Sequence, residues 1–287
     1  MAGASSCPPW GTTWTEVTPV RRCAALPCRV EIPEQFAQLW AAERPDLEEL
    51  VCAVSANGRP DAADPRVLLD DLVLSITERS GEPSGPGALV KALCGSGVLR
   101  GDTQTYDSPE NSLLDRVLER GCGIPLSVAV VVVLLGRRLG VDLEIIGLPG
   151  HVVARDPLGG SVFDVFDGGR VLDAPSVVAL ARRYEPAWQP RPGGEVALDV
   201  RSVVDRWCRN LRSAYVRLGD DSGLERVLAL ELRRRPPPSD ALGAATTRLV
   251  ARGAYLEAAG LLEEHALPGP TGDALRSSAQ RLRALLN

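Results

Sequence analysis

The chain has 287 residues, of which 45% are hydrophobic and 24% charged, a composition that is ordinary for a globular protein. Its length accommodates two modest domains, or one domain with a helical appendage. A net charge of −5 supplies no clustered positive charge, so we expect no nucleic-acid partner. The longest apolar run, 126–135, has about half the length of a membrane span, so we expect no membrane association.

Cysteine and histidine usage argues against disulfides and metals. The seven cysteines are scattered and odd in number, which is not typical of a disulfide framework. Pro8 and Pro9 lie where a secretory signal would need its apolar region, so we expect a cytoplasmic protein with reduced thiols. There is no Cys-x-x-Cys motif, and the two histidines, His151 and His265, are far apart, so we predict no zinc site and no cofactor.

The first hundred residues read as a tail followed by a helical layer. Residues 1–30 are rich in Pro, Ser, Thr and Ala without periodicity, which predicts a flexible N-terminal tail. Alternatively, Trp10 and Trp14 dock on the core as an anchor. Apolar residues then recur at helical spacing in three stretches, which predicts helices over 33–53, 66–78 and 88–93.

A helix is expected from about residue 109 to 120. Ser108 can cap it with Pro109 at its first position, or Ser112 can cap it one turn later in a box-like arrangement with Asp115. Asn111 is interpreted as a cap or turn residue, with a direct role in a cleft as the alternative.

The central stretch begins with Gly-Ile-Pro-Leu-Ser and contains five valines. Valine by itself favours a strand, but Pro125 suits the first position of a helix and Gly140 the position after its end. We therefore predict a fully buried helix between these two residues.

Three strands are expected next, over 142–146, 151–155 and 162–166, with a turn at 156–159. A two-residue turn would place His151 opposite Asp164. If Gly159 is a bulge residue, the register slips by one and the two side chains no longer face each other. The sequence leaves both registers open.

Residues 186–198 are rich in proline and glycine and predict a linker. The helical sequence beyond it repeats with an offset of 34 residues, the tetratricopeptide period. Two such units cannot bury a core alone, so residues 273–286 are expected to cap them. Chance similarity among helices rich in Leu, Ala and Arg is the alternative. The repeated positions are Gly219 and Gly253, Leu224 and Ala258, Val227 and Leu261, Leu228 and Leu262, and Pro236 and Pro270.

The run N-S-L-L-D-R-V-L-E-R-G-C-G-I-P-L-S, followed by R-R-L-G, P-G-H and F-D-V-F-D-G-G, resembles the bacterial SirB-type transglutaminase-like core family. Members of that family join such a core to C-terminal tetratricopeptide repeats. The resemblance implies an α+β fold, with a transglutaminase-like (papain-like) core, a helical N-terminal layer and a small antiparallel sheet. It divides the chain into a core over 31–185, the linker over 186–198 and a TPR-like helical region over 199–287.

Active relatives of the wider fold use a Cys, His, Asp triad with the cysteine at the first turn of a buried helix. The resemblance assigns the histidine to His151, which follows Gly150, and the aspartate to Asp164. In the nucleophile's position stands Pro125. Ser127 would point to the opposite side of the helix, and the only nearby substitute is a folded-back Cys122.

The leading hypothesis is therefore a non-catalytic protein-interaction or regulatory protein that binds a protein or peptide partner through its TPR-like helices. The alternative is a cysteine-dependent amide hydrolase or acyl transferase that uses Cys122, His151 and Asp164. A third possibility is a binder of small ligands in a degenerate cleft.

Overall fold

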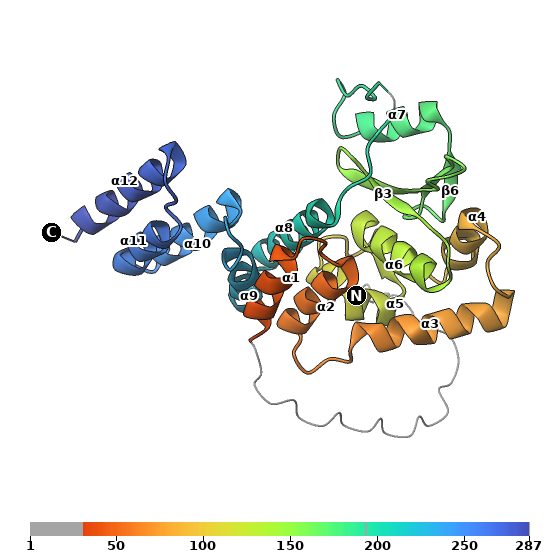
Figure 1. The fold of residues 1–287 in the computed structure, drawn as a ribbon, viewed down its shortest axis with the longest axis horizontal. Coiled ribbons are helices and arrows are strands. Elements are labelled where there is room, and N and C mark those ends of the chain that lie inside the picture. The colour runs from red at the N-terminus through yellow and green to blue at the C-terminus, as the bar shows by residue number, and fades with distance from the viewer. Residues whose placement is uncertain (1–30, 193, 287) are drawn as a thin grey trace, which may run out of the picture.

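The computed structural model describes residues 31–192 and 194–286, and the predicted tail with Trp10 and Trp14 lies outside them. Twelve α-helices and six short strands are described within these ranges (Figure 1). No helix among them is long and apolar enough to cross a membrane.

The helical layer consists of α1 (Ile32–Ala41), α2 (Leu47–Gly58) and α3 (Pro65–Ser80). The single helix predicted over 33–53 is wrong, because the chain breaks at 42–46. Pro45 cannot continue a helix, and the Asp46 side chain accepts a hydrogen bond from the Glu49 amide at 2.9 Å to begin α2.

Short elements connect this layer to the centre of the molecule. They are α4 (Pro86–Val90), the π-helical turn η1 (Lys91–Gly95), β1 (Arg100–Gly101), the 3₁₀ helix η2 (Pro109–Ser112), α5 (Leu114–Arg120) and β2 (Cys122–Gly123), which pairs in parallel with β1. Ser108 caps η2, as predicted, but the single helix expected over about 109–120 is wrong, because Leu113 in an extended conformation separates η2 from α5. The Ser112 cap is wrong: Leu113 precedes α5, and the Leu114 amide donates instead to Ser55 Oγ of α2 at 2.6 Å.

Helix α6 (Pro125–Arg138) confirms the predicted central helix, and Pro125 is its first residue. Every residue from 125 to 136 is buried, because α3, α4, α5 and α8 pack around α6 together with strands β3 and β4. A helix enclosed on all sides needs no polar face, which explains its run of valines.

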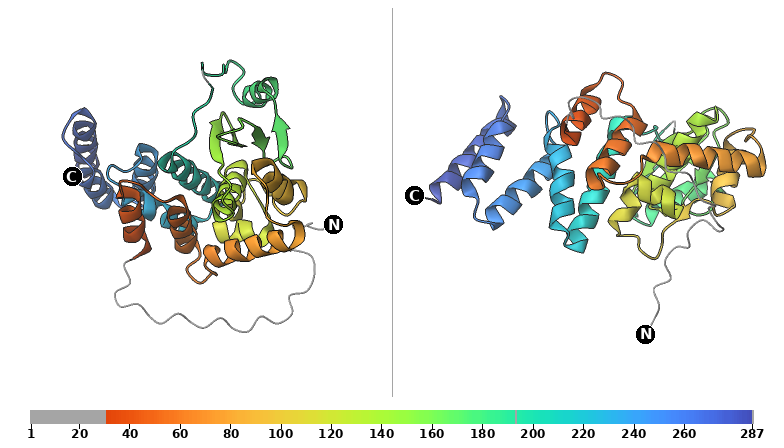
Figure 2. Two further views of the ribbon diagram at one scale, coloured as in Figure 1. Left: turned by 45° about the vertical axis from the view of Figure 1, so that its right-hand side comes forward. Right: turned by 90° about the horizontal axis from the view of Figure 1, so that it is seen from below.

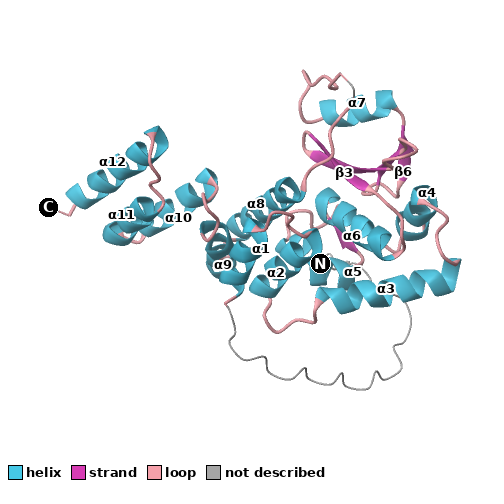
Figure 3. Ribbon diagram, in the orientation of Figure 1, coloured by secondary structure: helices cyan, strands magenta, loops and turns pink. Residues whose placement is uncertain are grey.

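The sheet has the order β3-β4-β5-β6 and is antiparallel throughout. Its strands are β3 (Glu144–Leu148), β4 (His151–Arg155), β5 (Val162–Asp164) and β6 (Arg170–Leu172). Figure 3 shows the sheet between α6 and α7 (Ala174–Arg182). Successive side chains of the strands point to opposite faces of the sheet. Val152 and Ala154 pack in the core around α6. Ile146 and Val153 pack in a smaller cluster with Leu180 of α7.

After α7 the described chain forms no helix until residue 200, and part of it follows the edge of the sheet. Ala197 forms a bridge with Ile146, and the Leu198 amide donates to Ile145 O at 2.8 Å.

Five helices complete the chain: α8 (Val200–Leu218), α9 (Asp221–Leu232), α10 (Ser239–Ala251), α11 (Tyr255–Glu264) and α12 (Pro270–Ala284). Gly219 and Gly253, at the predicted offset, end α8 and α10 with φ of 71° and 76°, a conformation that favours glycine. Helices α8 and α9 pack on α1 and α2, whereas α10–α12 extend away from the sheet (Figure 2).

Candidate functional site

The first turn of α6 presents no nucleophile. Pro125 occupies its first position and Ile124 precedes it in an extended conformation. Ser127 is 1% exposed and its Oγ donates to Ile124 O at 3.0 Å, so the hydroxyl is engaged in the helix's own first turn. The same Oγ occupies the space beside Gly123, where a Cβ would come within 2.3 Å of it.

His151 and Asp164 meet in the core. His151 Nε2 lies 3.0 Å from Asp164 Oδ1, and the two residues are 6% and 2% exposed. Burial raises the pKa of Asp164, but the hydrogen bond to His151 and the charge of its ring lower this pKa by a larger amount. The pKa of Asp164 therefore lies below its ordinary value. The pair is a charge-assisted contact within the core.

Neither register considered for these strands is correct. Ala154 lies opposite Phe163 and Arg155 opposite Val162, because residues 156–161 form a longer loop than a two-residue turn. This register places Asp164 two residues diagonally from His151 on the same face of the sheet. Since side chains alternate with a period of two, the contact is preserved.

The thiols in the core are not set up as nucleophiles. Cys122 is completely buried in β2. Burial raises the pKa of both Cys52 and Cys94 to about 12, and the Asp164 carboxylate adds to the effect at Cys94. Burial also raises the pKa of Cys208. A nucleophilic thiol needs the opposite shift.

Asn111 organises a loop rather than a cleft. Its side-chain amide donates to Thr105 O at 2.7 Å and to Tyr106 O at 3.2 Å, and its Oδ1 accepts from Arg120 at 3.0 Å. It caps no described helix, so the interpretation as a turn residue describes it better.

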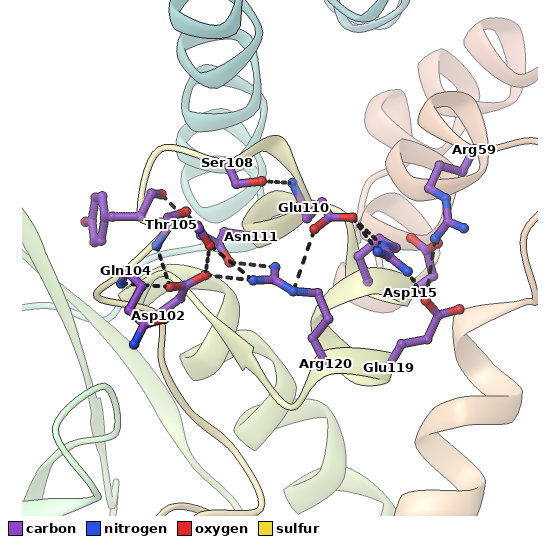
Figure 4. Close-up of polar contacts among 12 residues, drawn as sticks. Arg59, Asp102, Gln104, Thr105, Ser108, Glu110, Asn111, Asp115, Glu119 and Arg120 are labelled. Carbon is purple, nitrogen blue, oxygen red and sulfur yellow. Dashed lines mark hydrogen bonds and ion pairs between the residues drawn. The ribbon is translucent and has the colours of Figure 1, made fainter. Parts of the chain in front are cut away.

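Asp102, which the sequence analysis missed, is the centre of this network (Figure 4). It is 2% exposed and accepts hydrogen bonds from the backbone amides of Gln104 at 3.0 Å and Thr105 at 2.8 Å, from the Thr105 hydroxyl, and from Arg120 Nη2 at 2.7 Å. Burial raises its pKa, but the bonds from Thr105 and Arg120 outweigh this and lower the pKa to about 2. The local signal for such a turn is the aspartate itself, because its side chain can accept from the backbone amides of the residues that follow it.

Polar and aromatic groups that the sequence analysis also missed surround His151. Phe166 meets its ring edge-on at 5.9 Å, and Tyr106 in turn meets Phe166 edge-on at 6.2 Å. Gly150 has φ of 61° and lies under the Tyr184 ring, where a Cβ would come within 2.2 Å of the ring. Arg206 Nη2 donates to His151 O at 3.2 Å.

The described residues contain no group of three or more His, Cys, Asp or Glu side chains that could hold a metal ion. The groups near His151 can form hydrogen bonds. They are the imidazole of His151, the carboxylate of Asp164, the hydroxyl groups of Tyr106 and Tyr184, and the guanidinium of Arg206.

Comparisons with known proteins give relatives for parts of this chain. The chain is 38% identical over 128 residues to a UPF0162 protein of Xylella fastidiosa, covering 40% of this chain and 43% of the relative. It is 27% identical over 186 residues to a UPF0162 protein of Pseudomonas aeruginosa, covering 63% and 68% of the two chains. A shorter match, 34% identical over 71 residues, covers 24% of this chain and 11% of mouse F-box only protein 21.

The match thus spans less than half the length of the Xylella relative. The family model described as transglutaminase-like superfamily matches residues 66–209, from α3 into α8, and includes α6, His151 and Asp164. This is half of the chain, and the protein therefore belongs to the transglutaminase-like superfamily.

Proposed function

We propose that this protein is a non-catalytic interaction or regulatory protein of the SirB type, in which a transglutaminase-like core without a nucleophile supports TPR-like helices that bind a segment of a partner protein. The observation that carries the proposal is Pro125 at the first position of α6. A proline side chain offers no atom that can attack a carbonyl carbon, and Ser127 is engaged by Ile124 O.

The C-terminal helices provide the binding surface of the proposal. A cavity of about 690 Å³ lies between α10 and α12, with residues from the loops beside them, and its volume is in the range of ligand pockets. Its lining is mostly apolar, with hydroxyl groups and His265 as polar members, and contains no Asp, Glu, Lys or Arg. We expect an uncharged, apolar segment in it. The recurrence of Gly219 as Gly253 supports the assignment to tetratricopeptide repeats.

A cysteine-dependent hydrolase or acyl transferase is the second candidate, because His151 and Asp164 are 3.0 Å apart, as a base and its orienting carboxylate would be. It requires Cys122 to become accessible and to be activated by His151.

Site-resolved alkylation separates the two candidates. The protein is treated with iodoacetamide between pH 6 and pH 9, and the labelling of Cys122 is followed by mass spectrometry in the wild type and in His151→Ala. We expect slow labelling that rises only above about pH 8, as for an unperturbed thiol, in both proteins. Rapid labelling near pH 6 that His151→Ala abolishes would overturn the non-catalytic proposal.

A peptide-display selection tests the binding surface. Selected peptides should bind about 10-fold more weakly to Thr246→Arg, which places a charge in the groove, because a buried charge without a partner is costly. Leu256→Arg is the matched control, since Leu256 of α11 is 57% exposed and is not part of the groove. Equal binding to both variants would contradict the assignment of this surface.

A further inference from the structure

Arg206 of α8 lies across the hairpin that carries His151. Its Nη2 donates to His151 O at 3.2 Å and to Leu148 O at 3.5 Å. Its Nη1 fills the space over Gly147, where a Cβ would come within 2.7 Å of that nitrogen. Glycine at position 147 therefore provides room for the guanidinium.

Arg206 forms no ion pair among the described residues. It differs in this from two more deeply buried arginines, Arg212 of α8 and Arg234 just after α9. Arg212 pairs with Asp240, and Arg234 pairs with Asp205 at 2.6 Å. Burial and the nearby charge of Arg209 lower the pKa of Arg206, and no carboxylate counteracts them. Its guanidinium donates hydrogen bonds to backbone carbonyls, which carry no negative charge, and its remaining N–H groups can still donate.

Two tyrosines lie near the hairpin that carries His151. Tyr184 lies over Gly150 and is 60% exposed, and Tyr106 is 43% exposed and reaches the site over Phe166. Burial raises the pKa of Tyr106, as does the proximity of Tyr184 and Asp107, while Arg206 and Arg217 act in the opposite direction. The Tyr106 hydroxyl therefore keeps its proton at neutral pH and can donate a hydrogen bond. Asp107, the acid next to Tyr106, is paired with Arg217 at 2.9 Å.

We propose that Arg206, Tyr106 and Tyr184 form a binding site for a carboxylate group. A guanidinium edge and two hydroxyl donors match the two oxygens and single charge of a carboxylate. The site lies on the core, apart from the groove of α10–α12, so the proposal goes beyond the function proposed above and does not depend on it. The carboxylate belongs to a peptide C-terminus or to an acidic side chain.

Three probes distinguish these sources: acetyl-tetraalanine with a free C-terminal carboxylate, the same peptide as its C-terminal amide, and that amide with one alanine replaced by glutamate. Binding to the full chain is followed by NMR titration. We expect at least one of the two carboxylate probes to bind and the plain amide to bind at least 10-fold more weakly. The carboxylate probe that binds better identifies the source.

Arg206→Met should weaken binding of the carboxylate probe at least 10-fold, as expected for the loss of a hydrogen bond to a charged group. Arg201→Met is the matched control, because Arg201 is also on α8 and also donates to backbone carbonyls, those of Trp40 and Ala42. Equal binding of the plain amide, tighter binding of inorganic phosphate, or unchanged binding by Arg206→Met would each overturn the proposal.

A second variant covers the case in which Arg206→Met fails to fold. Tyr106→Phe combined with Tyr184→Phe removes two hydroxyl groups and keeps both rings. It should fold normally by circular dichroism and weaken carboxylate binding about 3- to 10-fold. Wild-type affinity in this double variant would remove the tyrosines from the site and overturn the proposal as stated.

Discussion

The transglutaminase-like core and the helices α10–α12 differ in how completely they bury apolar surface. In the core, every residue from 125 to 136 of α6 is buried, and the polar groups His151 and Asp164 are 6% and 2% exposed. In α10–α12, the separate cluster of buried apolar residues is small and consists of Leu242, Ala259, Leu262 and Ala279. A mostly apolar cavity of about 690 Å³ is open between these helices. A fold can bind a partner where it leaves apolar surface uncovered, and here that surface lies in α10–α12.

The boundary between the two regions lies within the five C-terminal helices. Helices α8 and α9 belong to the large core cluster by their packing on α1 and α2, although the sequence offset of 34 residues predicts that they form one repeat unit and α10 and α11 the next. Three predictions test this boundary and the polar groups on its core side.

The largest effect is expected for Trp207→Ala. Trp207 of α8 is 1% exposed and its Nε1 donates to Ser112 O of η2 at 2.8 Å. Because the substitution removes this bond and leaves a cavity, it should lower the free energy of unfolding by about 4 kcal/mol, measured by urea denaturation. Leu218→Ala, at a 66% exposed position of the same helix, should change it by less than about 0.5 kcal/mol. A small effect of Trp207→Ala would place α8 outside the core.

A pH-dependent effect is expected at Glu231 of α9. Its side chain is 2% exposed, and its Oε2 lies 3.6 Å from Arg212 Nη1. Neither of these two atoms has a hydrogen-bond partner among the described residues. Burial raises the pKa of Glu231 from 4.5 to about 7, against the opposing charge of Arg212. A carboxyl group whose pKa is higher in the folded state binds its proton more tightly there, so folding stability falls as the pH rises from about 4.5 to 7.

Glu231→Gln should therefore gain about 3 kcal/mol of stability relative to the wild type between pH 4.5 and pH 8, measured by urea denaturation across this range. Glu225→Gln is the control on the same helix: Glu225 is exposed, and the contact with Arg252 lowers its pKa, so its effect should have the opposite sign. If the stability of Glu231→Gln and that of the wild type change in parallel with pH, the carboxyl group of Glu231 has no raised pKa in the folded protein, and this prediction is wrong.

The smallest of the three effects is expected for Asp102→Asn. The pKa of Asp102 is lowered from 3.8 to about 2, so its charge stabilises the fold above pH 4 and this contribution is lost as the pH falls toward 2. The substitution should cost roughly 2 kcal/mol at pH 7, measured by urea denaturation. Asp107→Asn removes a carboxylate from an exposed ion pair with Arg217 and should cost less than about 1 kcal/mol. Equal losses in both variants would show that burial of Asp102 contributes nothing.

Much of the fold could be predicted from the sequence because the relevant signals are local. Pro125 and Gly140 bracket α6, Ser108 caps η2, and His151 begins β4 as expected. The break between α1 and α2 was missed because apolar spacing continues across Pro45, and the strand register was missed because the loop at 156–161 has six residues.

The candidate site was predictable only in part. The resemblance singled out His151 and Asp164, and the structure brings them together. Arg206 and Tyr184 could not be found in this way, because their partners come from segments distant in the sequence: Arg206 bonds the carbonyl of His151, and Tyr184 lies over Gly150. Asp102 has a local turn signal, but its bond with Arg120 of α5 depends on the fold.

By itself, the sequence determined the limits of α6 and the cap of η2, since proline, glycine and capping residues act within a few positions of themselves. It also determined that no nucleophile stands at Pro125. Only the tertiary structure decided that α8 and α9 complete the core while α10–α12 leave a groove, and that Arg206 lies beside His151 with no acidic partner in residues 31–192 and 194–286. Burial and charge compensation depend on which segments pack together, and local residue patterns do not contain that information.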